Sequence, residues 1–466
     1  MLFAGRVWLI PAHFSTDPNE GWNAFQAARA ISAGVLYPPP GSLTGNNYPP
    51  LSFFIVGGIG RVIGDAIVAG RLIALVSVLI VAGLVFAAVR LVGGRSAVAP
   101  VLGTLLFLGC NATILRPYLA MDDPQWLGHA LMTAGIVLLL AGETHAPLRP
   151  GRIASAALLV VCGGLVKHNL VAFPLAATLW LMLYDRRALA VWIATSALTL
   201  LATVSLLDHA YGAAFFADLL TSDRHYSALR MVVKSVGPVA VMLPMILVTL
   251  RLRRIRGLDP RIDLLLLMVV ISVPLGIVQR SGQGVDRNAH FEAFIALSIA
   301  TAASLGRCGF AMQKPRLLRP LPWLIVPFLL LLPGATLADF RDLVHQSDRQ
   351  VAWTVLQDRI ATIPGPVACE TLALCYWAGK SFELDFFLYG QQVAVQHDAA
   401  ALTQALVNCR FMAIELNRRR DRPLGEVRNP MRALISRYYH PVFVDKGGYQ
   451  LLMPASCPTA PATMRR

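Results

Sequence analysis

The chain has 466 residues, of which 56% are hydrophobic and only 14% are charged, and its formal net charge is +15. A soluble domain usually carries roughly 25% charged residues, so this composition excludes an ordinary soluble protein. The charge does not indicate nucleic-acid binding, because much of it lies in short loops between apolar segments, as the positive-inside rule predicts.

The start of the chain is expected to form an outer loop with two interfacial helices. The first apolar run, 2–12, is short for a span, so either the first helix is short and partly buried or the true start lies upstream. If the N-terminus is cytoplasmic, residues 14–64 lie outside. Helical spacing predicts an amphipathic helix at 20–33 that Gly34 ends. The apolar, glycine-broken run 51–64 predicts an interfacial or re-entrant helix.

Most of the remaining apolar runs have the length that a hydrocarbon core of about 30 Å requires. Together with the first run they predict about eleven transmembrane helices. The expected spans after the outer loop are 66–89, 97–115, 125–141, 153–166, 170–184, 188–207, 236–250, 264–278, 291–305 and 321–337. If 51–64 were a full span, Arg90 and Arg95 would lie outside, against the positive-inside rule. The sequence therefore predicts a polytopic α-helical membrane protein.

Residues 338–466 are polar and contain no expected span. Four short runs are typical of buried strands, at 366–370, 411–416, 441–445 and 449–453. Helices are expected at 350–363 and 399–408. We therefore expect two domains, a membrane domain at 1–337 and a small α/β domain on the outer face at 338–466.

The outer domain contains an even number of cysteines, Cys369, Cys375, Cys409 and Cys457. An oxidising compartment would permit disulfides among them, and four buried thiols are the alternative. The other three cysteines, Cys110, Cys162 and Cys308, lie in spans or inside.

Two acidic motifs lie at the outer ends of apolar helices, at 17–22 (DPNEGW) and 121–124 (MDDP). An ionisable group at a bilayer edge is costly unless it is paired, hydrated or functional. The expected topology places both motifs on the same face of the membrane. We therefore predict that Glu20 and Asp123 meet there in a site.

These motifs and their layout resemble the C-type-fold membrane glycosyltransferases that use polyprenyl-phosphate sugars. The resemblance is to the lipid A aminoarabinose transferase and to the bacterial group related to protein mannosyltransferases. It rests on the acidic first loop with its helix and Gly34, and on Asp123-Pro124. Three further segments carry it, at 48–51 (YPPL), 69–72 (AGRL) and 284–292 (GVDRNAHFE).

The chain departs from that family at two places. Asn19 stands where the family usually has the aspartate taken as the base, so Glu20, Asp17 and Asp123 all remain candidates for that role. The lysine that follows the first loop in the aminoarabinose enzyme is absent, since Asn47-Tyr48 stand there. The resemblance therefore implies no counterpart here for the phosphate contact of that lysine.

Glycosyl transfer needs a base for the acceptor hydroxyl and positive groups near the departing phosphate. The candidate catalytic residues are Glu20, Asp123, Asp122 and Asp17. The candidate substrate-binding residues are Asn19, Tyr48, Arg116, Lys167, His168, Arg287, Asn288, His290 and Glu292. No residue set supports a metal site, and a divalent cation is left open.

Structural roles compete with these assignments. Glu20 suits the first turn of a helix, where the dipole favours an acid, and Asp123-Pro124 suits a helix start. Lys167 follows an apolar span and would snorkel to the interface. Asn288, His290 and Glu292 are equally expected in a polar network between helices.

The function that we expect is transfer of a sugar from a polyprenyl-phosphate donor to an envelope glycan, lipid or protein, with inversion at the sugar carbon. The resemblance implies the bacterial inner membrane, with the C-terminal domain in the periplasm. The main alternative is a secondary transporter or flippase of a lipid-linked or small solute, which should carry ionisable residues within its spans. A third hypothesis is that the protein is a catalytically inactive scaffold.

Overall fold

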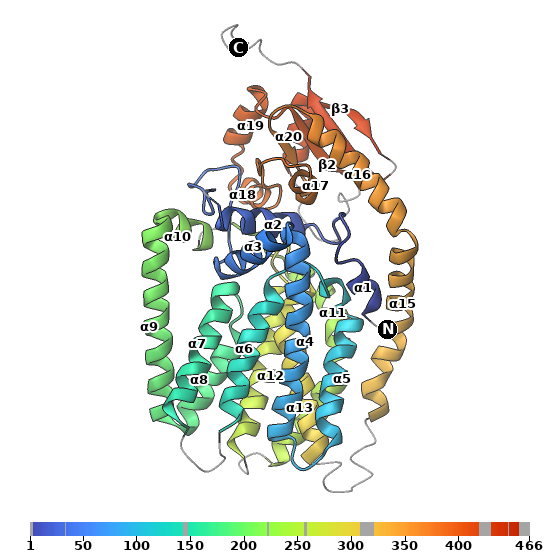
Figure 1. Cartoon of the computed structure of the whole chain (residues 1–466). Coiled ribbons are helices and arrows are strands. Elements are labelled where there is room, and N and C mark those ends of the chain that lie inside the picture. The colour runs from blue at the N-terminus through green and yellow to red at the C-terminus, as the bar shows by residue number, and fades with distance from the viewer. Residues whose placement is uncertain are drawn as a thin grey trace.

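The computed structural model describes residues 3–32, 34–142, 148–220, 223–255, 259–307, 321–418, 430–445 and 447–455. Figure 1 shows two layers, a bundle of long helices below and an α/β part above. Two shorter helices, α2 (Asn19–Ala30) and α3 (Leu51–Ile63), lie between the layers.

The lower layer consists of apolar helices that alternate in direction. Their bounds are α4 (Ala66–Val92), α5 (Val98–Ala112), α6 (Gln125–Leu140), α7 (Pro150–Val166), α8 (Ala172–Tyr184), α9 (Arg186–Tyr211), α11 (Ala228–Thr249), α12 (Pro260–Gln279), α13 (Phe291–Leu305) and α15 (Leu321–Val344). Within the described residues, five helices are long and apolar enough to cross a membrane: α4, α9, α11 with its continuation, α12 and α15. The chain is therefore a multi-pass membrane protein.

The expected count of eleven spans is not confirmed. The first apolar run forms only α1 (Ala4–Trp8), a helix of 5 residues, which is far too short to cross a bilayer. It packs against α15, next to the upper part of that helix in Figure 1. A second difference is that α11 begins at Ala228 rather than at residue 236.

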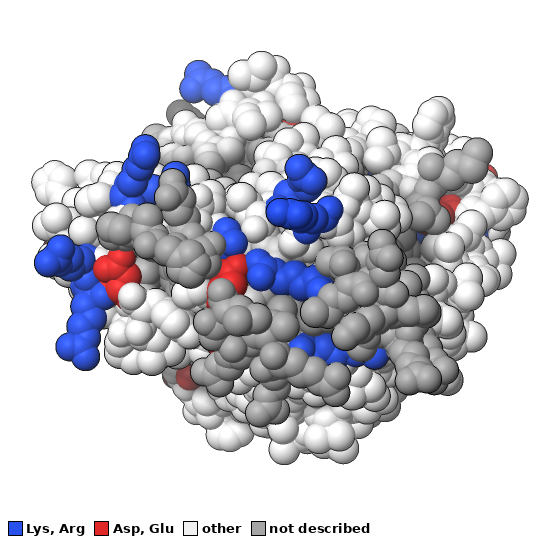
Figure 2. Space-filling model, turned by 90° about the horizontal axis from the view of Figure 1, so that it is seen from below, with Lys and Arg blue, Asp and Glu red and all other residues white. Residues whose placement is uncertain are grey.

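Arginines gather at the lower ends of the helices, and Figure 2 shows that they dominate the charged surface there. These arginines are Arg90, Arg95, Arg149, Arg152, Arg186, Arg187, Arg251, Arg261 and Arg307. Asp259 pairs with Arg261 at 2.9 Å and with Arg307, which ties α12 to the end of α13. The distribution is the one that the positive-inside rule expects of a cytoplasmic side.

The upper layer contains one four-stranded sheet in the order β1-β2-β4-β3. The first pair is parallel, and the other two pairs are antiparallel. The strands are β1 (Val367–Cys369), β2 (Ala413–Asn417), β3 (Tyr439–Val444) and β4 (Tyr449–Pro454). The helices are α16 (Gln346–Thr362), α17 (Leu372–Trp377), α18 (Leu388–Gln396), α19 (Ala400–Val407) and α20 (Pro430–Tyr438). All four expected strands and both expected helices are present, but β3 is mostly exposed and not buried as expected.

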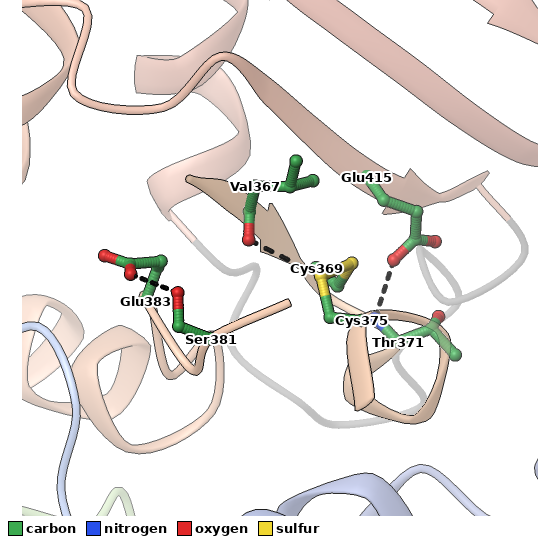
Figure 3. The surroundings of a disulfide bond; sticks show 7 residues. All are labelled: Val367, Cys369, Thr371, Cys375, Ser381, Glu383 and Glu415. Atoms are coloured by element: carbon green, nitrogen blue, oxygen red, sulfur yellow. Dashed lines mark hydrogen bonds between the residues drawn. A yellow bond between two sulfur atoms is a disulfide. The ribbon is translucent and has the colours of Figure 1, made fainter. Parts of the chain in front are cut away.

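A disulfide joins Cys369, at the end of β1, to Cys375 on α17 (Figure 3). The same turn is held by the Thr371 amide, which donates to the Glu415 carboxylate at 2.7 Å. Cys409 also takes part in a disulfide, whereas Cys457 lies outside the described residues. Disulfides are therefore present among the cysteines of the upper layer. Of the two alternatives, disulfides or four buried thiols, the first is the one observed.

The upper layer shares its core with the first loop of the chain. Phe14 and Phe25 belong to the same buried cluster as Trp353, Val367 and Leu372. The expected boundary at 337 falls inside α15, which continues to Val344. The first loop is therefore packed between the bundle and the sheet.

Candidate functional site

Glu20, in the first turn of α2, forms a buried ion pair with Arg71 of α4. Both side chains are 0% exposed. The Arg71 Nε donates to Oε1 and its Nη2 to Oε2, each at 2.8 Å. Burial alone would raise the pKa of Glu20, but the Arg71 guanidinium and the hydrogen bonds to the carboxylate hold that pKa below its usual value. Glu20 is therefore an ionised group whose two oxygens are both engaged.

Arg71 also fastens the beginning of the chain to α4. Its guanidinium donates to four backbone carbonyls, at distances of 2.7–3.1 Å. These carbonyls belong to Leu9, Ile10, Ala12 and Phe14. The Glu20–Arg71 pair thus organises the first outer segment around the top of α4.

Two glycines allow close approaches next to this pair. A Cβ on Gly21 would lie 2.0 Å from the Ala373 amide nitrogen, so α2 runs directly under α17. A Cβ on Gly70 would lie 1.9 Å from the Asp122 Oδ1, so the second acidic motif packs directly on α4. Any larger side chain at either position would push these elements apart.

The two acidic motifs meet, because the Asp122 amide donates to the Glu20 Oε1 at 3.3 Å. Asn23 of α2 also donates to the Asp122 carbonyl at 2.6 Å. Asp122 is 1% exposed, and its Oδ2 has no hydrogen-bond partner within the described part of the chain. Burial, and then the nearby Glu20 carboxylate, raise the pKa of Asp122 well above its usual value. Asp122 is therefore a buried carboxyl group that lies beside the ion pair and has one oxygen unsatisfied among the described residues.

A second group of polar residues, which we call the Lys167 cluster, consists of Tyr48, Asp123, Gln125, Lys167 and Asn288. The Lys167 Nζ donates to the Gln125 Oε1 at 2.9 Å and lies 4.0 Å from the Asp123 Oδ1. It also lies 4.8 Å from the centre of the Tyr48 ring. The Gln125 Nε2 donates to the Asn288 carbonyl at 2.7 Å. Four separate outer connections therefore meet at one buried cation.

Asp123 has one engaged oxygen and one open oxygen. Its Oδ1 accepts from the Gln125 amide at 2.8 Å, at the start of α6. No hydrogen bond or ion pair among the described residues reaches its Oδ2. Burial alone would lower the pKa of Lys167, but the Asp123 carboxylate, and then Tyr48, hold it above its usual value. Lys167 is therefore a stable buried cation.

Several candidate residues lie outside the Lys167 cluster. Arg116 pairs with Asp339 and, at 3.2 Å, with Asp342, so its charge holds η1 (Arg116–Tyr118) to α15. The Asn19 amide donates to the Asp17 Oδ1 at 2.9 Å, at the accessible start of α2.

The 284–292 segment contains both structural and uncommitted groups. The Glu292 carboxylate accepts from the Phe173 amide at 3.0 Å and from the Ala172 amide at 3.4 Å, which caps α8. Arg287 donates to the Ile114 carbonyl at 2.9 Å. His290 is buried, and both its ring nitrogens lack a partner within the described residues. His168, beside Lys167, is exposed.

Sequence reasoning missed three residues of this region. Arg71 stood in a motif that carried the resemblance, but its 51-residue separation from Glu20 hid the pairing. Gln125 directly follows Asp123-Pro124, and that adjacency was the available signal. Arg224 lies near enough for its charge to act on Lys167 and His168, and no motif marked it. Among the described residues, no group of three or more His, Cys, Asp or Glu side chains is placed to hold a metal ion.

Comparisons with known proteins find structural relatives only. No family model matches the chain, and no curated protein sequence does. The crystal structure of ArnT from Cupriavidus metallidurans in the apo state is 15% identical and has a TM-score of 0.61, over 96% of this chain and 95% of that one. The same protein bound to undecaprenyl phosphate gives 15% identity and a TM-score of 0.58, with the same coverage.

A third solved structure is the archaeal oligosaccharyltransferase AglB from Archaeoglobus fulgidus, in complex with an inhibitory peptide and a dolichol-phosphate. It is 10% identical and has a TM-score of 0.52, over 87% of this chain and 66% of that one. At these identities the likeness establishes the fold. The chain therefore has the C-type glycosyltransferase fold, as the resemblance in its sequence implied.

Proposed function

We propose that the protein is a glycosyltransferase that moves a sugar from a polyprenyl-phosphate donor to a cell-envelope acceptor, at the periplasmic face of a bacterial inner membrane. One observation carries this proposal. In a fold shared with an undecaprenyl-phosphate-bound structure, Lys167 and Asp123 lie 4.0 Å apart with side chains that are 5% and 4% exposed. A buried cation beside a carboxylate supplies the two charges that the reaction requires.

Lys167 is the group that we assign to the donor phosphate. A cation held in a dry site stabilises developing negative charge more strongly than one in water does. Arg287 and Arg224 are half-buried in the same outer region and add positive potential. Tyr48, Asn288, His168 and His290 remain candidates for contacts with the donor.

Asp123 is the residue that we assign as the general base. Its Oδ2 is uncommitted, whereas both oxygens of Glu20 are held by Arg71. Asp122 suits a supporting role, because its backbone amide and carbonyl bind Glu20 and Asn23 of α2. Asp17 and Asn19 lie at the accessible start of α2 and remain candidates for acceptor contacts. Of the three acids that the sequence left open as the base, Asp123 fits that role best.

The proposed step is a displacement at the anomeric carbon. The acceptor hydroxyl attacks that carbon, and its proton passes to the Asp123 carboxylate. The bond between the anomeric carbon and the phosphate oxygen breaks, and the polyprenyl phosphate leaves with the electron pair. Direct displacement inverts the configuration at the sugar carbon.

Two features support the periplasmic orientation. Disulfides persist mainly in oxidising compartments, and the outer layer contains the Cys369–Cys375 bond. The opposite end of the bundle carries the arginines that favour the cytoplasm.

The proposal is tested by binding of undecaprenyl phosphate to the full chain in nanodiscs. Lys167→Met should weaken binding about 10-fold or more, because a hydrogen bond to a charged group contributes about 1.5–3 kcal/mol. Lys234→Met, on α11 outside the Lys167 cluster, is the matched control and should bind normally. Equal binding in both variants would contradict the phosphate assignment. Solute movement in sealed vesicles without a lipid-linked donor would instead favour the transporter.

A further inference from the structure

A polar cavity of about 180 Å³ lies between the 39–47 loop, α10 (Ala213–Leu220) and α18. Its polar walls include Asn46, Asn47, Asp218, Asp223 and Gln392. Of the described residues that line it, none is Lys or Arg. Amides and carboxylates with no cation make a surface that accepts hydroxyl groups and repels anions.

Asn46, which lines the cavity, carries a buried donor that is unsatisfied among the described residues. The residue is 1% exposed, and its backbone amide donates to the Asp218 Oδ2 at 3.0 Å. Its Oδ1 accepts from the Tyr48 amide at 3.1 Å. Its Nδ2 has no partner among the described residues. A buried donor without a partner is costly, so an oxygen of a bound ligand would stabilise this wall.

The cavity adjoins the Lys167 cluster through the same loop. Asn46 and Asn47 line the cavity, and the centre of the ring of the next residue, Tyr48, lies 4.8 Å from the Lys167 Nζ. A ligand held against Asn46 and Asn47 would therefore lie next to the loop residue whose ring faces Lys167.

We propose that this cavity is the acceptor subsite and that it binds a carbohydrate group without negative charge. The inference rests on the proposed function and adds the chemical class of the acceptor. Sugar hydroxyls both donate and accept hydrogen bonds, which suits the Asn46 amide, Gln392 and the Asp218 carboxylate. Asp218 and Asp223 would repel a phosphorylated or carboxylated sugar.

The test is binding of three soluble probes to the full chain in phosphatidylcholine nanodiscs, followed by saturation-transfer NMR. The probes are methyl glucoside, methyl glucosaminide and glucose 6-phosphate. The first two should bind. The affinity for glucose 6-phosphate should be lower by about 10-fold or more, because its phosphate meets two carboxylates. Gln392→Trp should abolish binding of the first two by filling the cavity. Gln404→Trp, at an exposed position of α19, should leave binding unchanged.

Three outcomes would overturn the proposal: no binding of either methyl glycoside, equal binding of glucose 6-phosphate, or binding that survives Gln392→Trp. If that variant does not fold, Asp218→Asn replaces it. This variant should reduce the difference in affinity between the methyl glycosides and glucose 6-phosphate. An unchanged difference counts against the subsite. Undecaprenyl phosphate binding, measured in the same samples, should be normal in all cavity variants. Loss of lipid-phosphate binding in Lys167→Met with intact sugar binding would separate the two sites.

Discussion

The two acidic motifs of the outer face look alike in sequence but have opposite environments. Glu20 is closed, because Arg71 occupies both of its oxygens and the ion pair is fully buried. Asp123 is open in the sense that its Oδ2 has no hydrogen-bond or ion-pair partner among the described residues, although Lys167 lies beside its carboxylate. The comparison teaches that an acid beside a membrane can serve architecture or chemistry, and that its partners decide which.

The closed motif supports the open one. Glu20 accepts a hydrogen bond from the Asp122 amide, and Gly70 lets Asp122 pack against α4. Asp123 follows directly in the chain. The ion pair thus positions the loop that presents the carboxylate, and the first three variants below separate positioning from chemistry.

The largest effect on activity is expected for Asp123→Asn. Loss of a general base typically reduces the rate by about 10²–10⁴-fold, and the amide keeps the size of the side chain. Transfer from a polyprenyl-phosphate sugar should fall accordingly, with rates normalised to folded protein. A rate within a few-fold of the wild type would remove Asp123 from the role of base.

Glu20→Gln should act on stability first. It leaves the buried Arg71 charge unpaired, which typically costs about 3–5 kcal/mol. Denaturation in detergent should show this loss, whereas Asp17→Asn, at a partly exposed position of the same motif, should change stability by only about 0.5 kcal/mol. If Glu20→Gln is fully stable and inactive, the base is Glu20 and the comparison is reversed.

Gly70→Ala should displace Asp122. The new Cβ would lie 1.9 Å from the Asp122 Oδ1, and overpacking of this kind typically costs about 1–3 kcal/mol. Gly83→Ala is the matched control on the same helix, because a Cβ there meets nothing within 4 Å. We expect the control to be neutral or slightly stabilising in thermal unfolding. Equal behaviour of the two variants would mean that Asp122 does not pack on α4 as described.

The smallest effect is a pH dependence in the polar cavity. Burial raises the pKa of Asp218 to about 6, with Asp385 nearby and Asp223 also lining the cavity. Asp218 is therefore neutral below about pH 6 and gains its charge above it. Binding of methyl glucosaminide should strengthen as the pH rises through 6, because a cation then meets a carboxylate. Methyl glucoside should change less, and Asp218→Asn should remove the difference between the probes.

Much of the architecture could be predicted from hydropathy and periodicity. Apolar runs located the bundle helices, and short runs in the polar C-terminal part located all four strands of the sheet. The prediction that the first apolar run contributes a span was wrong, because α1 has only 5 residues. A short apolar run has the same composition whether it crosses a bilayer or packs on the outer side of another helix.

The site was harder to predict, because it depends on partners that are distant in the chain. Asp339 binds Arg116 from 223 residues away, which turns a candidate phosphate ligand into a structural group. The use of Glu292 as a cap for α8 likewise spans 119 residues. Local sequence identified which residues are polar at the outer face but not which of them are already paired.

The most direct test of the central claim is a structure of the full chain with undecaprenyl phosphate, determined by cryo-electron microscopy in nanodiscs. We predict that a phosphate oxygen lies about 2.7–2.9 Å from the Lys167 Nζ, the distance of a charge-assisted hydrogen bond. The Asp123 Oδ2 should face the space beside that phosphate, with the Glu20–Arg71 pair unchanged. A phosphate bound elsewhere, with the Lys167 cluster undisturbed, would contradict the account.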